Sequence, residues 1–582
     1  MDSCFRRNDK LYYDTMTIEL TSIYLDLFNP ARLLGPIFDK ELRVSSRRRR
    51  SYVLRCAYIV ALSVFIVSAW YSILGARSSG SVVYQVSRFS QIGRTVIASI
   101  VWFQFVVAQL IAIVMLSASI SDEIRAGTLA VLMTTPIRSF QIVAGKLLSR
   151  LLQLILLLAI SLPLLTIVRV FGGVTWAFVL SSVCVTLTAV FFSGAVSLLL
   201  SMTYRQAHIV ILVTIIGYMV IFGILPGLFN LLAVAGLFNR DTTQSIIALT
   251  NPFWAFAGTN AKFLFQSGVP TLFSWPLHCL IMLVLTAIVM ALSVLRVRKA
   301  ALGEGFGKKS GLWFRRASKR TIRTYSGKIR FEPIRPVTGP PIIWKEMRKG
   351  IIGRGKGDIV LFALLIGAFL ISAVFMLFIG RGNVGMMVLP SFLLSGLYLV
   401  VMIRLAVFSA GSLTMEKEAR TWPILLTTPL ADREIVRGKA IAAFRRNMPL
   451  ILVYFALLCL QYVLLSGALR NEMYAQLFYM LVVSACNIAG SVFFVIGTGL
   501  YFGVRLKTTT AAVAATAGLY FAMTYLLCGL FNPARIYFYR TISRQDMMWL
   551  SYALPIALAF INAGIGAVFA RRAVCRLRRN IF

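Results

Sequence analysis

Residues 174–202 read VTWAFVLSSVCVTLTAVFFSGAVSLLLSM and contain no charged side chain. Because an α-helix rises about 1.5 Å per residue, roughly 20 apolar residues cross the hydrocarbon core of a bilayer. This stretch is therefore predicted to be a membrane-spanning helix. Further stretches of the same kind are predicted to span the membrane at 53–74, 95–120, 151–168, 209–235, 274–295, 359–379, 386–413, 448–467, 475–503, 509–531 and 547–570.

The composition of the whole chain supports this assignment. Apolar residues make up 59% of the sequence and charged residues only 14%, with a mean hydropathy of +0.81. A soluble globular domain carries about 25% charged residues. The predicted fold is an all-α polytopic membrane protein with about 12 transmembrane helices.

The net charge of +40 raises the question of nucleic-acid binding. The basic residues, however, gather in the leader, after the second span, in the central linker and in the tail. These segments share one side of the membrane if there are about twelve spans, and the positive-inside rule makes that side cytoplasmic. We therefore expect a multi-pass protein of the bacterial inner membrane with both termini in the cytoplasm. Its predicted partner is the lipid bilayer, and no nucleic acid is expected. The loop carrying Arg535, Arg540 and Arg544 is an exception to this charge pattern.

Metal and catalytic sites are not predicted. The eight cysteines occur singly and without a C-x-x-C motif, and the two histidines, His208 and His278, lie on different spans. This pattern supports neither a disulfide framework nor a metal site. We find no nucleophile–base or paired-carboxylate arrangement, so no residue is predicted to be catalytic.

An internal repeat relates the two halves of the chain. Glu123–Lys146 aligns without a gap with Glu416–Lys439 and is identical at 11 of 24 positions, where residue usage alone gives about one or two. Residues 36–43 match 341–348, and Asn251-Pro252 matches Asn532-Pro533 more weakly. The chain is therefore interpreted as a tandem duplication of two parallel six-helix repeats.

The repeat divides the chain into five segments. The expected order is a cytoplasmic leader with an interfacial helix at 1–52, a first six-span unit at 53–295, a basic linker with a second interfacial helix at 296–357, a second six-span unit at 358–570 and a basic tail at 571–582. In each interfacial helix a proline suits the first turn, and the charges are expected to face water. Those charged residues are Lys40, Glu41, Arg43, Lys345, Glu346 and Arg348.

The segment after the second span of each unit is the main functional candidate. It reads EIRAGTLAVLMTTP at 123–136 and EKEARTWPILLTTP at 416–429. The pattern predicts two short helices with a break between them, and Thr135 and Thr428 are expected to be N-caps that precede a proline. A simple hairpin connection does not need the same defined structure twice. The segment is therefore interpreted as a docking surface for a cytoplasmic partner.

These motifs resemble those of ABC-2 type transporter permeases. The order E-x-x-x-G-T-L, T-T-P and I-V-x-G-K, the K-E-L/M-R leader and the asparagine–proline pair carry the resemblance over both halves. It implies a fused pair of permease units and an exporter driven by a separate cytoplasmic ATPase subunit in two copies, which binds ATP and Mg²⁺. The chain itself binds no cofactor. The docking residues carried over are Glu123, Gly127, Thr128, Leu132, Thr134, Thr135, Pro136, Glu416, Thr421, Leu425, Thr427, Thr428 and Pro429. The second copy departs from the pattern at Arg420 and Trp422, which leaves open whether both copies couple equally.

The energy source is expected to lie outside this chain. The phosphate-binding string G-x-x-x-x-G-K-[ST] is absent from the sequence. No Asp or Glu lies well inside a predicted span, whereas ion-driven carriers usually hold carboxylates there. A secondary transporter driven by an ion gradient stays open as an alternative, as does a non-transporting ABC-type membrane device.

Two features within the spans have two readings each. Arg404 either reaches back to the cytoplasmic interface or lines the translocation path. Gly499 and Gly503 form a G-x-x-x-G pattern that is consistent with close helix packing but common in membrane proteins. Self-association of the chain also stays open, because either one chain or two form the membrane unit.

Overall fold

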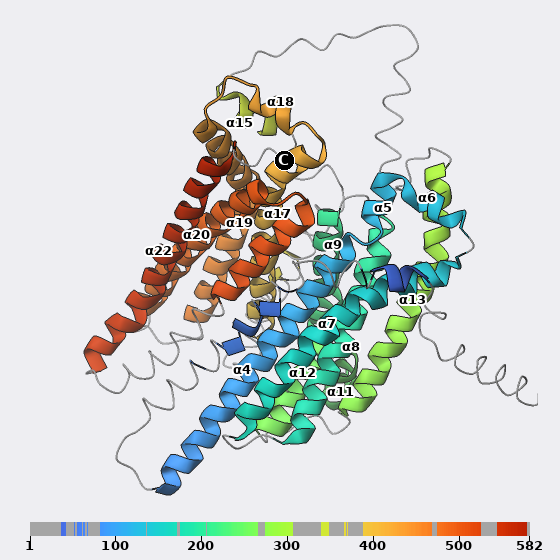
Figure 1. The fold of residues 1–582 in the computed structure, drawn as a ribbon. Helices are drawn as coiled ribbons and strands as arrows, with labels where there is room; N and C mark the ends of the chain where they lie inside the picture. The colour runs from blue at the N-terminus through green and yellow to red at the C-terminus, as the bar shows by residue number, and fades with distance from the viewer. Residues whose placement is uncertain are drawn as a thin grey trace, which may run out of the picture.

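The computed structural model describes a helical protein (Figure 1). The described residues are 36–41 and 43, scattered positions between 52 and 67, 82–135, 137–170, 175–204, 207–234, 236–265, 274–305, 339–347, 366, 367, 369, 370, 388–467, 474–524 and 544–578. Within these ranges the regular elements are helices, and the chain forms no strand. The predicted all-α fold is thus confirmed.

The helices of the first half run from α4 to α13. Their bounds are α4 Val82–Ser117, α5 Ser121–Ala126, α6 Thr128–Met133, α7 Ser139–Val170, α8 Trp176–Ser201, α9 Ala207–Met219, the π-helical turn η1 Val220–Ile224, α10 Leu225–Val234, α11 Arg240–Thr250, α12 Pro252–Asn260, the π-helical turn η2 Ala261–Phe265 and α13 Trp275–Gly305. Those of the second half are α15 Pro341–Met347, α17 Val388–Glu418, α18 Trp422–Leu426, α19 Asp432–Gly467, α20 Tyr474–Arg505, a helix at 509–524 and α22 Arg544–Arg576.

Nine helices among the described residues are long and apolar enough to cross a membrane. They correspond to nine of the predicted spans. The predicted spans at 53–74 and 359–379 fall largely outside the described residues, and 509–531 is described, as a helix, up to residue 524. The span of α13 has a mean hydropathy of 2.6, yet only 22% of it is buried inside the protein. An apolar helix this exposed is stable when its outer face lies in lipid.

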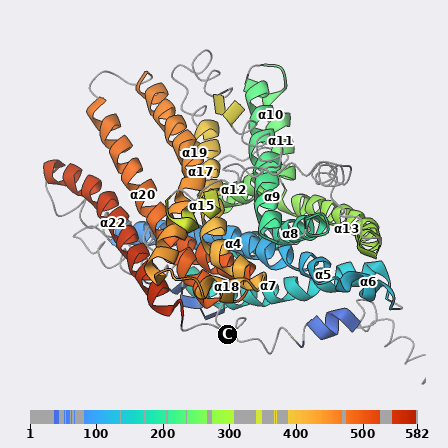
Figure 2. The same ribbon diagram turned by 90° about the horizontal axis from the view of Figure 1, so that it is seen from above.

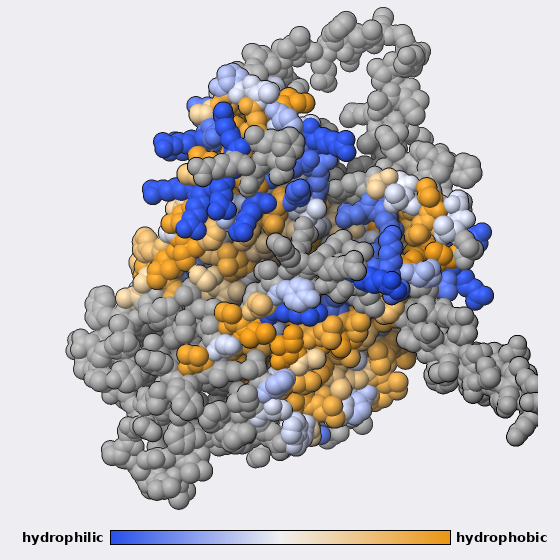
Figure 3. Space-filling model, viewed as in Figure 1, coloured by the Kyte–Doolittle hydropathy of each residue, from blue (hydrophilic) through white to orange (hydrophobic). Residues whose placement is uncertain are grey.

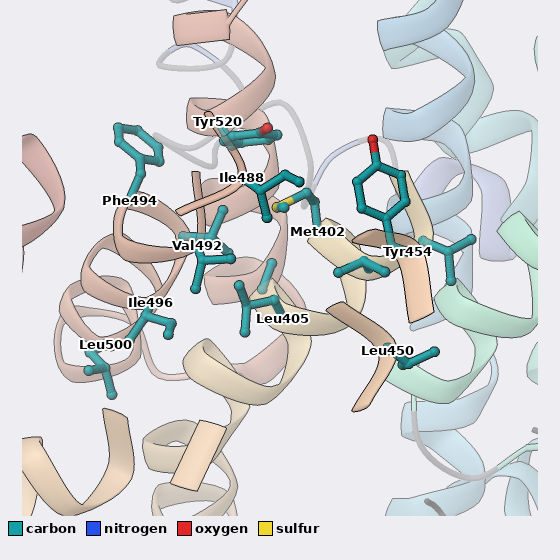
Figure 4. Close-up of a cluster of buried hydrophobic side chains, with 14 of the residues drawn as sticks. Met402, Leu405, Leu450, Tyr454, Ile488, Val492, Phe494, Ile496, Leu500 and Tyr520 are labelled. Carbon is teal, nitrogen blue, oxygen red and sulfur yellow. The ribbon is translucent and has the colours of Figure 1, made fainter. Parts of the chain in front are cut away.

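The two halves form two helix bundles with the same packing order. In the first bundle α4 packs against α7 and α8, and α13 packs against α7 and α8; in the second, α17 packs against α19 and α20, and α22 packs mainly against α20. The core of the second bundle joins Leu405 of α17 and Leu450 of α19 with Val492 and Leu500 of α20 (Figure 4). This core also includes Met219 and Ile224 of the first half, whereas the first bundle buries separate apolar clusters between its helices.

Glycines let α20 approach its neighbours closely. A Cβ atom on Gly499 would lie 2.0 Å from the Ser409 hydroxyl oxygen, and one on Gly503 would lie 2.9 Å from the Ala410 carbonyl oxygen, both on α17. On the other side, a Cβ atom on Gly497 would lie 2.0 Å from the carbonyl oxygen of Gly566 in α22. The G-x-x-x-G pattern thus lies in the contact with α17, where no side chain fits.

The two bundles meet along their second and fifth spans. α4 and α9 of the first half contact α17 and the helix at 509–524 of the second. The apolar side chains buried together in this contact are Ile113, Ile211, Ile215, Ile403, Val407, Ala410, Ala512 and Val513. Corresponding elements of the two halves thus face each other.

The segment 236–273 lies between the fifth and sixth predicted spans, which places it outside the cytoplasm in the predicted topology, and it contains the helices α11 and α12. Asn251 separates them and caps α12, because its side-chain oxygen accepts a bond from the Phe253 N–H at 2.9 Å. Its amide nitrogen donates at 2.6 Å to the carbonyl of Phe222, which lies in the π-helical turn η1. Asn251-Pro252 therefore fixes the loop to the fifth span. The matching pair at 532–533 lies outside the described residues.

One end of the molecule is polar. The short helices α5, α6, α15 and α18 all lie at this end, which is uppermost in Figure 1 and is called the polar end below. Hydrophilic side chains gather there, whereas hydrophobic side chains cover much of the flank below it (Figure 3). The view from above shows α6 at the outer edge of the first bundle, next to α5, and α18 among the helices of the second (Figure 2).

Candidate functional site

A left-handed turn precedes the short helix in both halves. In the first half, Gly127 separates α5 from α6 and has a φ of 71°. In the second half, the aligned residue Arg420 lies between α17 and α18 and has a φ of 57°. Arg420 is the only non-glycine residue with a positive φ in the described part of the chain. The replacement of glycine by Arg420 in the second copy thus leaves the backbone conformation of the turn unchanged.

Threonine hydroxyls hold the two turns in the same way. The hydroxyl of Thr128 donates to the carbonyl of Glu123 at 3.4 Å. Its counterpart Thr421 donates to the carbonyl of Glu416 at 3.3 Å. Since the sequences differ at many other positions, these matching bonds indicate that the two segments share the same local structure.

The predicted N-cap role of Thr135 and Thr428 is wrong. Each hydroxyl donates to the carbonyl three residues earlier, at 2.5 Å for Thr135 and 2.6 Å for Thr428. The next helices begin only at Ser139 and Asp432. The threonines therefore close the short helices α6 and α18 instead of opening α7 and α19.

The starts of α7 and α19 are capped by another pair of aligned residues. The N–H of Arg138 donates to the side chain of Gln141 at 3.2 Å, and the N–H of Ala431 donates to the side chain of Glu434 at 3.4 Å. This bond is the backward half of a capping box, in which the third helical residue satisfies the N–H of the cap. It fixes where the third span of each unit begins.

A buried ion pair joins each segment to the third span. The Nζ atom of Lys146 in α7 lies 2.6 Å from Oε1 of Glu123, and that of Lys439 in α19 lies 2.7 Å from Oε1 of Glu416. The lysine side chains are 5% and 1% exposed. The glutamates, which were predicted to contact a partner, thus face inward and anchor the segment.

The interfacial helices are held by carboxylates at the same polar end. Glu41 lies 3.2 Å from Arg150 of α7, and Glu346 of α15 lies 2.8 Å from Lys439. Lys345 also lies 3.4 Å from Glu416. In the second half, one lysine therefore binds both the interfacial helix and the segment that leads to α18.

The remaining charged residues of the interfacial helices are exposed. Lys40 is exposed, and Arg43 forms an ion pair with Asp39 of the same helix at 2.8 Å. Ile37 and its counterpart Ile342 are buried instead. Arg348 lies outside the described residues. Each of these short helices therefore has a buried apolar side and a charged side in contact with water or with α7 and α19.

Other predicted docking residues lie on or near the surface. Gly127, Thr128, Thr134, Thr135, Thr421, Thr427 and Pro429 are exposed, and Leu132, Leu425 and Thr428 are half-buried. Pro136 lies outside the described residues. The hydroxyls of Thr134 and Thr427 also donate to carbonyls three residues earlier. Their exposed surface is thus available for contact, while their hydroxyl protons are already used.

Two exposed residues were missed from the sequence. Val131 of α6 is 65% exposed and Ile424 of α18 is 67% exposed, although both are large and apolar. They occupy aligned positions in the repeat. The neighbouring aligned pair, Leu129 and Trp422, is buried instead. The repeat does contain a signal for them, because valine and isoleucine are similar side chains at aligned positions.

Arg404 lies within the span of α17 and is 5% exposed. Its guanidinium lies 5.3 Å from the centre of the Phe408 ring, and that of Arg446 in α19 lies 4.1 Å from the same ring. Helical side chains normally lean toward the N-terminus of the helix. Phe408 lies one turn nearer the polar end, and its ring contacts the Arg404 guanidinium.

Metal ligands do not cluster in the described part of the chain. No group of three or more His, Cys, Asp or Glu side chains there is placed to hold a metal ion. Nδ1 of the buried His278 lies 2.7 Å from the Leu249 carbonyl. The charged groups that do gather are those of the polar end.

The sequence was compared with known protein families and with curated proteins. Residues 36–302 match the model of a family described as ABC-2 family transporter protein. This region runs from the first interfacial helix to α13 and includes α5 and α6. No curated protein matches the chain.

Proposed function

Because residues 36–302 belong to the ABC-2 family of transporter proteins, we propose that the whole chain is the membrane permease of an ATP-driven exporter. A separate ATPase subunit, present in two copies, binds ATP and Mg²⁺ and docks on α6 and α18. The polar end then faces the cytoplasm of a bacterial cell, and both termini lie on that side. The chain itself carries out no hydrolysis.

The observation that carries this proposal is the pair Val131 and Ile424. An aliphatic side chain at an aligned position of each half is about two-thirds exposed, 65% and 67%, at the polar end. Exposing such a side chain to water is unfavourable, whereas burying it in a groove on a protein partner is favourable. Two matching exposed residues on two matching short helices favour two copies of one partner.

The anchoring of the segments supports a coupling role. The helices that lead into α6 and α18, α5 and the end of α17, are joined to the third span through Glu123–Lys146 and Glu416–Lys439. A displacement of the short helix is therefore transmitted to the third span through an ion pair with a buried lysine, and is not absorbed by a flexible loop. ATP binding closes the two ATPases, and the segments pass this motion to the helices, so that the path opens alternately to the two sides.

The experiment is a pull-down of the tagged chain in mild detergent, with the bound fraction assayed for ATP hydrolysis. We expect Val131→Asp and Ile424→Asp each to weaken ATPase binding by at least about tenfold, because hot-spot residues contribute about 2 kcal/mol or more. Leu237→Asp is the matched control, because Leu237 is 68% exposed and lies in the predicted external loop.

The result can contradict the proposal in two ways. If wild-type chain recovers no ATPase under conditions that keep a known permease–ATPase complex intact, transport driven by an ion gradient replaces it. If an ATPase binds equally to wild type and to both aspartate variants, the docking surface lies elsewhere.

Arg404 is proposed to border the translocation path. Its burial within α17 and the nearby Arg446 place two positive charges around Phe408. The test is transport by Arg404→Leu, which we expect to be reduced at unchanged ATPase binding. Transport at the wild-type rate would remove Arg404 from the path.

One chain is proposed to supply the whole membrane unit. The apolar contact between α4 and α9 of one half and α17 and 509–524 of the other supports this, because it already joins corresponding elements. Native mass spectrometry of the complex should give one permease chain per two ATPases. Two permease chains per complex would instead indicate self-association.

A further inference from the structure

The last two residues of α17 contact the turn between α20 and the helix at 509–524. The Nζ atom of Lys417 donates to the carbonyls of Gly503 at 3.0 Å and Leu506 at 3.4 Å, and also to that of Val504. These carbonyls belong to the C-terminal end of α20. A lysine at this position satisfies carbonyls that have no partner within the helix.

The next residue caps the following helix. Oε1 of Glu418 accepts a bond from the N–H of Thr509 at 2.7 Å, where the helix at 509–524 begins. The Thr509 hydroxyl also bonds to Thr414 of α17 at 3.0 Å. Two adjacent residues of α17 thus hold the end of one helix and the start of the next.

The signs of these charges match the helix ends. The C-terminal end of a helix is partly negative and binds a cation, while the N-terminal end is partly positive and binds an anion. Lys417 and Glu418 satisfy both conditions at one turn. Exchanging the two charges would place each against an end of like sign, so the contact requires this order.

The same lysine also contacts the short helix. Its Nζ atom lies 5.4 Å from the centre of the Trp422 ring, and Trp422 is the first residue of α18. Trp422 is 3% exposed and packs in the core of the second bundle. Lys417 therefore lies between α18 and the turn at 505–509, in contact with both.

The first half is built differently at this position. Ile124 aligns with Lys417, Arg125 with Glu418 and Leu129 with Trp422. Ile124 and Leu129 are buried in one apolar cluster with Met202, which caps the end of α8. The isoleucine and leucine side chains there have no donor for a helix end, and an arginine has no acceptor for an N–H.

We propose that Lys417 and Glu418 are positioning residues that make the α20–509 turn move together with α18. Motion imposed on α18 then reaches the fourth and fifth spans of the second half through hydrogen bonds, whereas the first half transmits it through apolar packing. The inference rests on the proposed function only for the identity of the partner that moves α18. The contact itself is tested without that partner.

The test is amide hydrogen exchange of the full chain in lipid nanodiscs, followed by mass spectrometry of peptides covering 501–512. We expect Lys417→Met to raise exchange there about three- to tenfold, because a lost helix-end bond costs about 0.5–1.5 kcal/mol. Trp422→Leu, which installs the first-half residue, should raise exchange in the same peptides. Combined with Lys417→Met it should add little, because both changes break one chain of contacts.

Controls separate this chain of contacts from general loosening. Ile124→Met in the first half should leave exchange at 501–512 unchanged. Glu418→Ala should raise exchange at Thr509, whereas Glu418→Gln, which keeps an acceptor oxygen, should not; this pair keeps the test valid if Lys417→Met fails to fold. Unchanged exchange at 501–512 in folded Lys417→Met and Trp422→Leu would overturn the inference.

A second arm uses the complete complex. If an ATPase docks on α18, Lys417→Met should keep ATP hydrolysis and binding but lower the amount of cargo moved per ATP. If no ATPase binds even to wild type, the proposed function fails, while the exchange result still decides the role of the two residues. Unchanged cargo per ATP in a bound complex would contradict the transmission role.

Discussion

Gly127 and Arg420 share a left-handed backbone conformation, but they reach it at different conformational cost. A residue with a Cβ atom is disfavoured there by roughly 1–2 kcal/mol, and glycine is not. A Cβ atom on Gly127 would meet no atom within 4 Å. The preference for glycine at this turn is therefore one of backbone conformation and not of space.

Gly127→Ala should lower the free energy of unfolding by about 1 kcal/mol. Gly217→Ala is the matched control, because Gly217 also has no atom within 4 Å of an added Cβ but lies inside α9. There the change should be neutral or stabilising by up to about 1 kcal/mol. Thermal unfolding in detergent compares the two. Equal destabilisation of both variants would contradict the conformational argument.

Lys439 holds two carboxylates at once, with Glu416 at 2.7 Å and Glu346 at 2.8 Å. Lys439→Met should cost up to about 3–5 kcal/mol of stability, because it removes the nearest cation from two largely buried carboxylates. Lys345→Met should cost less than about 1 kcal/mol, since the Lys345 side chain is 59% exposed. Denaturant titration of the purified chain measures both. A small effect of Lys439→Met would mean that water reaches the carboxylates.

Repetition in the sequence identified the important positions, but it did not reveal which way their side chains point. Glu123 and Glu416 were expected to contact a partner, yet each bonds to a lysine that the same repeat also contains. A pair separated by 23 residues, Glu123 and Lys146, cannot be recognised as a contact until α7 is seen to fold back along α4. The exposed Val131 and Ile424 were overlooked because they are similar and not identical.

At the scale of elements, α20 and α22 lie so close that their backbones touch. A Cβ atom on Gly566 would lie 2.4 Å from the carbonyl oxygen of Phe493, whereas one on Gly564, two residues earlier in α22, would meet nothing within 4 Å. Close approach of this kind favours van der Waals contact between helices in a membrane.

Gly566→Ala should therefore separate the two helices and cost about 1–3 kcal/mol, as overpacking does. Gly564→Ala on the same helix is expected to be neutral or slightly stabilising. Resistance of the chain to unfolding by SDS provides the measurement. If both variants behave alike, the contact between α20 and α22 is looser than these distances indicate.

The third spans show which element boundaries the sequence did not predict. The span predicted at 448–467 belongs to α19, which begins at Asp432. The sequence predicted a separate short helix that begins after Thr428, and the charges Arg433, Arg437 and Lys439 hid its continuation into the span from a hydropathy pattern. The cap was also not predicted, because alanine has no capping side chain and the Ala431 N–H is instead satisfied by the side chain of Glu434. Long apolar runs predicted the existence of the spans, while tertiary contacts set where they begin.

At the scale of the whole molecule, α6 and α18 lie at the same end of the two bundles (Figure 1). This arrangement requires an even number of membrane crossings between them. In a background without the natural cysteines, Val131→Cys and Ile424→Cys should both react with a membrane-impermeant maleimide from the cytoplasmic side. Leu237→Cys should react only from the opposite side. Labelling of residues 131 and 424 from different sides would exclude the parallel arrangement.

The contact of Lys417 with the α20–509 turn exists in only one half of the chain, which shows that the two halves have changed independently. In an assembly of two identical subunits, any substitution appears in both copies at once and must be tolerated in both. Two halves encoded in one gene are inherited together but mutate separately. The residue at each of the two aligned positions, Ile124 and Lys417, is therefore exposed to selection separately, and one half is free to specialise without changing the other.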